Sequence, residues 1–209
     1  MQSETVSSKS LIDWGVASRA LPGQTVCGDL HLVQPVPFGV LLAVVDGLGH
    51  GDEATLAANT AVATLAEHSE ETLDALVERC HETLTKTRGV VMTAATLRAA
   101  DGQLTWLGVG NVEAARIRPG DETHAPAERV LLRSGIVGYR LPELHTSSQF
   151  VTPGDLLVFA TDGINAGFTK NLPTSDTPQK IADTILERHF KGTDDALVLV
   201  VRYLGASHE

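Results

Sequence analysis

Apolar and polar residues alternate along much of the chain with a period of two, which is typical of half-buried β-strands. Residues 12–16 show this alternation first, and residues 38–45 form a continuous apolar run that predicts a central strand. That run ends at Asp46 and Gly47, a pair typical of turns. Comparable patterns predict further strands over residues 30–36, 90–97, 103–109, 112–118, 129–132, 147–151, 155–160 and 196–204.

Three segments have apolar residues at intervals of three and four, the period of an amphipathic helix. The first begins at Asp52 and has mostly alanine on its apolar stripe, which permits close packing. The second has its stripe between residues 73 and 84, with Lys86 and Arg88 near its end, where cations stabilise the helix dipole. The third, over residues 177–186, starts with a threonine cap and a proline in the first helical position.

The order of these elements predicts the fold class. Strands follow one another in a meander, a helix pair is inserted after the third strand, and one helix precedes the last strand. This order differs from the regular alternation of parallel βαβ units. We therefore expect an α+β protein, a four-layer αββα sandwich in which helices flank two antiparallel sheets. The length favours a single domain over residues 1–209, with a polar N-terminal tail at about residues 1–10.

Composition and charge exclude several classes of protein. With 43% hydrophobic and 20% charged residues, the chain has enough apolar material for a sizeable core and is unlike disordered chains. Its 16 Lys and Arg residues against 26 Asp and Glu residues give a net charge of −10. Such a surface repels phosphate backbones and anionic lipid, so we expect neither a nucleic-acid partner nor a membrane partner.

The chain also shows no signal that would direct it to a membrane or out of the cell. Its first ten residues are polar, and its longest apolar runs, over residues 40–45 and 196–201, are far shorter than the ~20 residues that span a bilayer. Cys27 and Cys80 form neither a disulfide framework nor a CxxC metal knuckle, as is typical of a reducing compartment. The sequence predicts a cytoplasmic protein with free thiols, and a single bridge between the two cysteines is the alternative.

Four aspartates stand in similar contexts, next to a glycine or at the start of an acidic pair, and three of them adjoin strongly apolar strands. Asp29 follows a glycine, Asp46 begins an Asp-Gly-Leu-Gly-His-Gly segment, Asp162 lies in Thr-Asp-Gly, and Asp194 opens an Asp-Asp pair. Carboxylates that gather at the ends of buried strands destabilise one another unless a cation neutralises them. The four positions are therefore candidate metal ligands.

Oxygen ligands without a cluster of cysteine or histidine indicate a hard cation, Mn²⁺ or Mg²⁺, rather than zinc. Two such ions, ~3.5–4 Å apart and bridged by one carboxylate, activate a water molecule for in-line attack on phosphorus. A single Asp-Gly pair after a strand is usually only a turn, so the ordered set of four indicates this chemistry. The predicted reaction is hydrolysis of a phosphoester by a metal-bound water.

The motifs resemble those of metal-dependent protein phosphatases of the type 2C superfamily, in particular its SpoIIE-like branch, over residues 14–203. Shorter motifs at residues 86–89, 110–112, 134–135 and 161–165 resemble stand-alone members of this branch that act in feedback on the stressosome. The resemblance implies a phosphatase that uses two Mn²⁺ or Mg²⁺ ions. It also implies phosphoserine and phosphothreonine substrates on STAS-domain stressosome proteins, with dephosphorylation as negative feedback on stress signalling.

The resemblance further implies a role for each ligand. Asp46 bridges both ions, the Gly47 carbonyl binds one of them, Asp162 and Asp194 bind the other, and Asp29 acts through bound water. The motifs identify no general acid.

Two departures from the superfamily pattern keep other functions open. Leu197 stands where the superfamily usually has threonine, and Arg19 lies ten residues before Asp29, too far to match the phosphate-binding arginine of eukaryotic relatives. The alternatives are a non-catalytic docking module for phosphorylated scaffolds and a small-molecule phosphoesterase with the same metal chemistry. His50 could protonate a leaving alcohol, but a structural hydrogen-bond donor is the favoured interpretation. The segment 119–126 is expected to be a solvated loop.

Overall fold

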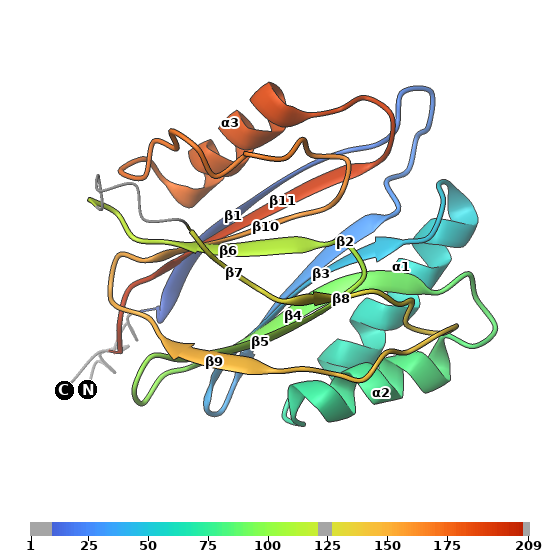
Figure 1. The fold of residues 1–209 in the computed structure, drawn as a ribbon, viewed down its shortest axis with the longest axis horizontal. Coiled ribbons are helices and arrows are strands. Elements are labelled where there is room, and N and C mark those ends of the chain that lie inside the picture. The colour runs from blue at the N-terminus through green and yellow to red at the C-terminus, as the bar shows by residue number, and fades with distance from the viewer. Residues whose placement is uncertain (1–9, 121–126, 207–209) are drawn as a thin grey trace, which may run out of the picture.

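The computed structural model describes residues 10–120 and 127–206, and the strands of these ranges form two sheets (Figure 1). Parts of two predicted segments, the tail at residues 1–9 and the loop at residues 121–126, lie outside the described residues. Sheet I has the strand order β1 (Ile12–Arg19), β11 (Ala196–Tyr203), β10 (Leu156–Ala160), β6 (Glu113–Ile117) and β7 (Glu128–Arg129). Sheet II has the order β2 (Asp29–Val36), β3 (Gly39–Gly47), β4 (Val90–Arg98), β5 (Gln103–Val109) and β8 (Leu132–Arg133), with β9 (Ser147–Phe150) also paired to β5.

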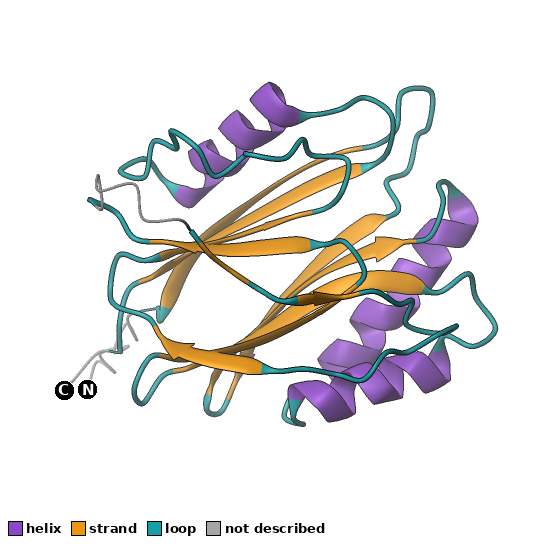
Figure 2. Cartoon of the chain, viewed as in Figure 1, coloured by secondary structure: helices purple, strands orange, loops and turns teal. Residues whose placement is uncertain are grey.

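Helices cover the outer faces of both sheets (Figure 2). Helices α1 (Asp52–Glu67) and α2 (Leu73–Thr83) pack on sheet II, and α3 (Pro178–His189) packs on sheet I. The predicted four-layer αββα sandwich is therefore confirmed. None of the helices in the described ranges is both long and apolar enough to cross a bilayer.

Strand β3 shows why its sequence is apolar without interruption. Leu42 and Val44 point into the core between the two sheets, where they meet Phe159 of sheet I. Their neighbours Leu41 and Val45 point the opposite way, into the core under α1 and α2. Because successive side chains of a strand face opposite sides and both sides are covered, every position of the strand is apolar.

The predicted strand over residues 129–132 is wrong, because the chain passes from one sheet to the other within it. Arg129 belongs to β7 and lies opposite Ala115 of sheet I, whereas Leu132 belongs to β8 and lies opposite Gly108 of sheet II. The pairing of β8 with β5 is parallel, so sheet II is not wholly antiparallel. This crossing segment connects the two sheets.

The helices begin where predicted, but two of them end elsewhere: α3 continues to His189, beyond the predicted residue 186, and α2 ends early. Thr177 caps α3, since its hydroxyl accepts a hydrogen bond from the Lys180 backbone N–H at 3.4 Å, and a proline follows as predicted. Helix α2 ends at Thr83, several residues before Arg88. The prediction that Arg88 stabilises the dipole of this helix is therefore wrong, and its side chain serves elsewhere.

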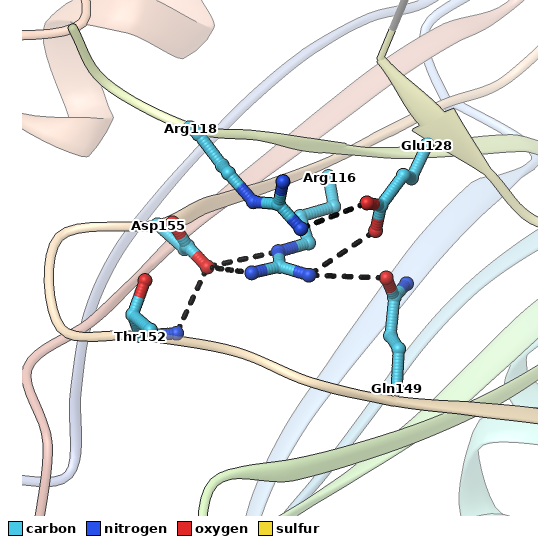
Figure 3. A network of polar contacts seen from close by, with 6 residues as sticks. All are labelled: Arg116, Arg118, Glu128, Gln149, Thr152 and Asp155. Atoms are coloured by element: carbon cyan, nitrogen blue, oxygen red, sulfur yellow. Dashed lines mark hydrogen bonds and ion pairs between the residues drawn. The ribbon is translucent and has the colours of Figure 1, made fainter. Parts of the chain in front are cut away.

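A buried ion pair lies within sheet I, where Asp155 precedes β10, and one of its hydrogen bonds reaches sheet II (Figure 3). Arg116 of β6 donates to Asp155 Oδ2 from Nε at 2.8 Å and from Nη2 at 2.6 Å, and both side chains are almost fully buried. Its Nη1 donates to Glu128 at 3.1 Å and to Gln149 of β9, in sheet II, at 3.2 Å. Asp155 also accepts a hydrogen bond from the Thr152 backbone N–H at 2.9 Å. The network therefore gives hydrogen-bond partners to both buried charges, the Arg116 guanidinium and the Asp155 carboxylate.

Candidate active site

Sheet II supplies the first pair of aspartates. Asp29 is the first residue of β2, Asp46 is the penultimate residue of β3, and the antiparallel register places the two directly opposite each other. The adjoining Gly47 donates a backbone hydrogen bond to the Gly28 carbonyl at 3.2 Å. Like charges at directly opposed positions destabilise a sheet, so this register requires a compensating interaction.

Sheet I supplies the second pair. Asp162 follows the end of β10, and Asp194 comes shortly before β11, its antiparallel neighbour. Thr161 fixes the two ends to each other, because its backbone N–H donates to the Leu197 carbonyl at 3.1 Å and its hydroxyl accepts from the Leu197 N–H at 2.8 Å.

The two pairs meet at one cleft. Its volume is about 430 Å³, and Asp46, Asp162 and Asp194 are among the residues that line it, while Asp29 lies buried behind Asp46. The rest of the lining comes from three loops and β4: Leu48, Gly49, Val91, Gly110, Asn111, Ser134, Gly135 and Ile136. The structure thus brings together all four aspartates that the sequence singled out.

Burial and mutual repulsion make these carboxyl groups hard to ionise. Burial raises the pKa of Asp46 to about 9, and the charges of Asp29, Asp162 and Asp194 add to the effect. The pKa of Asp29 is raised to about 7, chiefly by burial and further by Asp195 and Asp194. The pKa of Asp194 is raised in the same direction, again mainly by burial. A bound cation would reverse these shifts because it stabilises the charged forms.

The chemistry of these groups fits a hydrated divalent cation. Asp29 Oδ2 is buried and has no hydrogen-bond partner within the described residues, which marks an oxygen available to a ligand. Within those residues no three His, Cys, Asp or Glu side chains lie close enough together to hold a metal ion by themselves. Mg²⁺ typically binds through one or two carboxylates and keeps several waters, so two pairs of aspartates suit such ions.

The raised pKa values predict a pH-dependent stability of the metal-free protein. A carboxyl group whose pKa is higher in the folded than in the unfolded state stabilises the fold below about pH 4, and this stability is lost as the pH rises through the folded pKa, here toward 9. In the presence of a chelator, the melting temperature should therefore fall between pH 5 and pH 9. Excess Mn²⁺ or Mg²⁺ should restore most of the loss at the higher pH. A melting temperature that does not change with pH in chelator would contradict the raised pKa values.

Asp195 has a structural role that the sequence did not separate from that of Asp194. Its carboxylate is buried and accepts hydrogen bonds at 2.7 Å from the backbone N–H groups of Leu21 and Gly28. It thereby holds the segment between β1 and β2 and places Gly28, and with it Asp29, at the cleft. Adjacent residues at a strand end point in opposite directions, which could have distinguished the two aspartates.

Asn111 is a site residue that the sequence analysis treated only as part of a turn and a motif. Its side-chain Nδ2 donates to Asp162 Oδ2 at 2.8 Å, and it lines the cleft. On the other side, Lys191 Nζ donates to the Asp162 carbonyl at 2.5 Å. The two contacts orient Asp162, and nothing in the local sequence pattern indicates this pairing of distant residues.

The remaining candidates have other positions. His50 is exposed and follows Gly49, which lines the cleft. No hydrogen bond from its side chain occurs within the described residues, which disagrees with the structural role favoured from the sequence. Arg19 lies over the ring of Phe190 at 5.1 Å and does not line the cleft. The Leu197 side chain is buried in the core between the sheets. Cys27 and Cys80 are free thiols, as predicted, and burial raises the pKa of both to about 12.

The four-layer fold is shared with the solved PP2C phosphatase domain of SpoIIE from Bacillus subtilis, and comparison with known proteins specifies the family. A family model described as Stage II sporulation protein E (SpoIIE) matches residues 37–204. The chain belongs to this family.

Within the family, the chain is similar to RsbX. The phosphoserine phosphatase RsbX of Bacillus subtilis (strain 168) is 27% identical over 144 residues, which cover 68% of this chain and 70% of that protein. A solved structure from work on the bacterial stressosome as a modular system that controls secondary messenger signalling is 30% identical. It covers 91% of this chain and 99% of its own, with a TM-score of 0.82. A crystal structure of RsbX in complex with magnesium is 20% identical, covers 91% and 94% of the two chains, and gives a TM-score of 0.79.

Proposed function

We propose that the protein is a cytoplasmic Mn²⁺- or Mg²⁺-dependent phosphatase that removes phosphate from serine and threonine of STAS-domain stressosome proteins. In this role it provides negative feedback on stress signalling. The observation that carries the proposal is the meeting of two aspartate pairs, one from each sheet, at a single cleft with an unpartnered buried carboxylate oxygen. The similarity to RsbX and to a stressosome-related structure supports the choice of partner.

We assign the residues of the centre to two ions. Asp46 would be shared between both, the Gly47 carbonyl would contact one, and Asp162 and Asp194 would hold the other, with Asp29 acting through water. When bound, the ions supply positive charge for the phosphoryl group and lower the pKa of a water molecule. A side-chain carbon on Gly47 would collide with the Ala54 backbone of α1, which explains why this position is glycine.

The surrounding residues keep the ligands in place before any ion binds. Asn111 and Lys191 fix the Asp162 segment from two sides, and Asp195 fixes the backbone at Gly28. Such outer contacts matter because they orient the ligands and exclude other conformations. Nearby His50 is exposed and therefore accessible to a leaving alcohol, although no contact in the structure assigns it that step.

The departure at Leu197 does not favour the alternative of a non-catalytic docking module. Its side chain lies in the core between the sheets, whereas only its backbone contacts Thr161 next to the site. A leucine there leaves all four aspartates at the cleft.

Phosphate release from a phosphorylated STAS-domain protein tests the proposal. Release should require Mn²⁺ or Mg²⁺ and should stop when a chelator is added. Asp162→Ala should lower kcat/KM by more than the roughly 100-fold that even the outer partners of a metal ligand can contribute. Binding of the phosphoprotein by a folded wild type without any release would instead identify the docking module.

Turnover of a generic aryl phosphate distinguishes a small-molecule phosphoesterase from a protein phosphatase and from a docking module. A phosphatase built for a folded partner should have a much higher kcat/KM for the phosphoprotein than for the aryl phosphate, because the partner contributes binding energy away from the reacting centre. Equal values for both substrates would indicate a small-molecule phosphoesterase.

A further inference from the structure

The cleft has an unbalanced charge for a site that must accept a phosphate group. Three aspartates line it, and its lining within the described residues includes no lysine or arginine. A phosphomonoester brings close to two further negative charges at neutral pH. A cationic side chain that can reach the cleft from its rim would therefore be a main determinant of substrate binding.

Arg88 is placed at this rim by the segment between α2 and β4. The Gly89 carbonyl accepts a hydrogen bond from the Leu48 N–H at 3.2 Å, which attaches the segment to one wall of the cleft. On the other side, a side-chain carbon built on Gly89 would lie 2.7 Å from both Ile136 Cγ2 and the Val137 carbonyl, so no larger residue fits there. Since Leu48 and Ile136 both line the cleft, Gly89 lies between two of its walls and the preceding Arg88 lies at its rim.

The guanidinium group of Arg88 lies against the wall itself. A side-chain carbon built on Gly49 would be 2.5 Å from Arg88 Nη1, so the group occupies the space that a side chain at position 49 would need. Gly49 lines the cleft, and its φ of +91° also favours glycine. The glycine therefore leaves the guanidinium room to lie next to the cleft.

The present partner of Arg88 is one that a phosphate can replace. Arg88 forms an ion pair with Glu53 in the first turn of α1, and the two side chains are 51% and 67% exposed. Ion pairs between such exposed groups contribute little to stability. A phosphate dianion accepts two parallel hydrogen bonds from a guanidinium and carries more charge than a carboxylate, so it competes well for Arg88.

Lys191, a second cation close to the ligands, is already engaged. Its Nζ donates to the Asp162 carbonyl at 2.5 Å, and its backbone N–H donates to the Gly163 carbonyl at 2.9 Å. Both contacts hold the turn that presents Asp162.

We infer that Arg88 binds the phosphate group of the substrate and exchanges Glu53 for it when the substrate enters the cleft. The inference rests on the proposed phosphatase function and adds a specific anion-binding residue to it. Arg19 does not match the phosphate-binding arginine of eukaryotic relatives, and in this inference a different segment of the chain supplies the guanidinium.

Arg88→Met and Arg88→Lys are compared with the wild type in two measurements. The first is turnover of a phosphoprotein and of an aryl phosphate. Calorimetric binding of inorganic phosphate to the Mn²⁺-loaded protein is the second. In Arg88→Met, KM for both substrates and Kd for phosphate should rise by about 10- to 100-fold, the loss expected for hydrogen bonds to a charged group. Arg88→Lys should restore part of the loss, because the charge returns without the paired donors. Glu53→Gln should lower KM by up to about fivefold, since it releases Arg88.

Arg98→Met is the matched control. Like Arg88, Arg98 is about half exposed and forms an ion pair with a carboxylate, here that of Asp101. It lies at the end of β4 away from Arg88, so its variant should keep the wild-type KM and Kd. Unchanged KM and Kd in Arg88→Met would overturn the inference, as would an equal loss in Arg98→Met or a rise in KM in Glu53→Gln. A wild type that binds phosphate through Arg88 but shows no metal-dependent turnover would refute the proposed function and leave the inference standing.

Discussion

Asp46→Asn should abolish metal-dependent phosphatase activity and, in the same protein, raise the melting temperature of the metal-free form at pH 8. We expect activity to be lost because asparagine cannot supply the negative charge of the ligand that we propose is shared between both ions. Stability rises because the replaced carboxyl group has its pKa raised to about 9 by burial and by its four acidic neighbours, so that keeping it beside them costs free energy near neutral pH. Each kcal/mol gained should move the melting temperature by about 2–4 °C in a chain of this length.

The opposite signs of the two effects make this variant informative. Asp13→Asn, on the exposed side of β1, is the matched control and should change neither activity nor the melting temperature in chelator. Turnover and melting curves at pH 8, with chelator and with excess Mn²⁺, measure both effects. An active Asp46→Asn protein would refute the assigned centre, and a less stable one in chelator would refute the repulsion among the four carboxylates.

Asp155→Ala should lower the free energy of unfolding by about 3–5 kcal/mol, the range for removing one partner of a buried ion pair. Arg116 would keep its charge in a place where its side chain is only 4% exposed, with Gln149 and half-exposed Glu128 as remaining partners. Chemical denaturation measures the change, and the corresponding shift in melting temperature is about 6–20 °C.

The control for this variant is an ion pair of the same type at the surface. Asp101→Ala removes the exposed carboxylate that pairs with Arg98 and should lower the free energy of unfolding far less, because exposed ion pairs contribute little to stability. Similar losses in both variants would show that burial does not determine the value of the Arg116–Asp155 pair. The Asp155→Ala protein that remains folded should keep the wild-type KM, because Asp155 lies at the end of β10 opposite to Asp162.

The sequence predicted the layers well because the hydrophobic pattern is determined by burial on one or both sides of each element. In β3, both sides are covered, and the continuous apolar run at residues 38–45 follows directly. The pattern failed at residues 129–132 for the same reason. Val130 is buried next to the crossing between sheets, so an apolar residue there carries no information on which sheet its neighbours join.

The candidate site was predictable as a set of aspartates that come together, but the contacts that position them were not. The four aspartates adjoin strands or turns that are readable along the chain, and strand pairing brings them together. Asn111 contacts Asp162, which is far away in the sequence, and Arg88 lies next to Gly49 of another loop. Such contacts arise only when the chain packs. Asp194 and Asp195 have different roles because their side chains point in different directions, and the sequence of an Asp-Asp pair does not show these directions.

The division of the four aspartates between two separately hydrogen-bonded sheets has a consequence for the protein as a whole. Ions that engage both pairs would act as a reversible cross-link between the halves of the sandwich, much as a disulfide joins distant segments, and their binding free energy would add to that of folding. The affinity for the metal ions would then depend on the distance between the two sheets. A substitution such as Phe159→Leu in the intervening core, which touches no ligand, would be detected first as weaker metal binding, before any loss of the native fold.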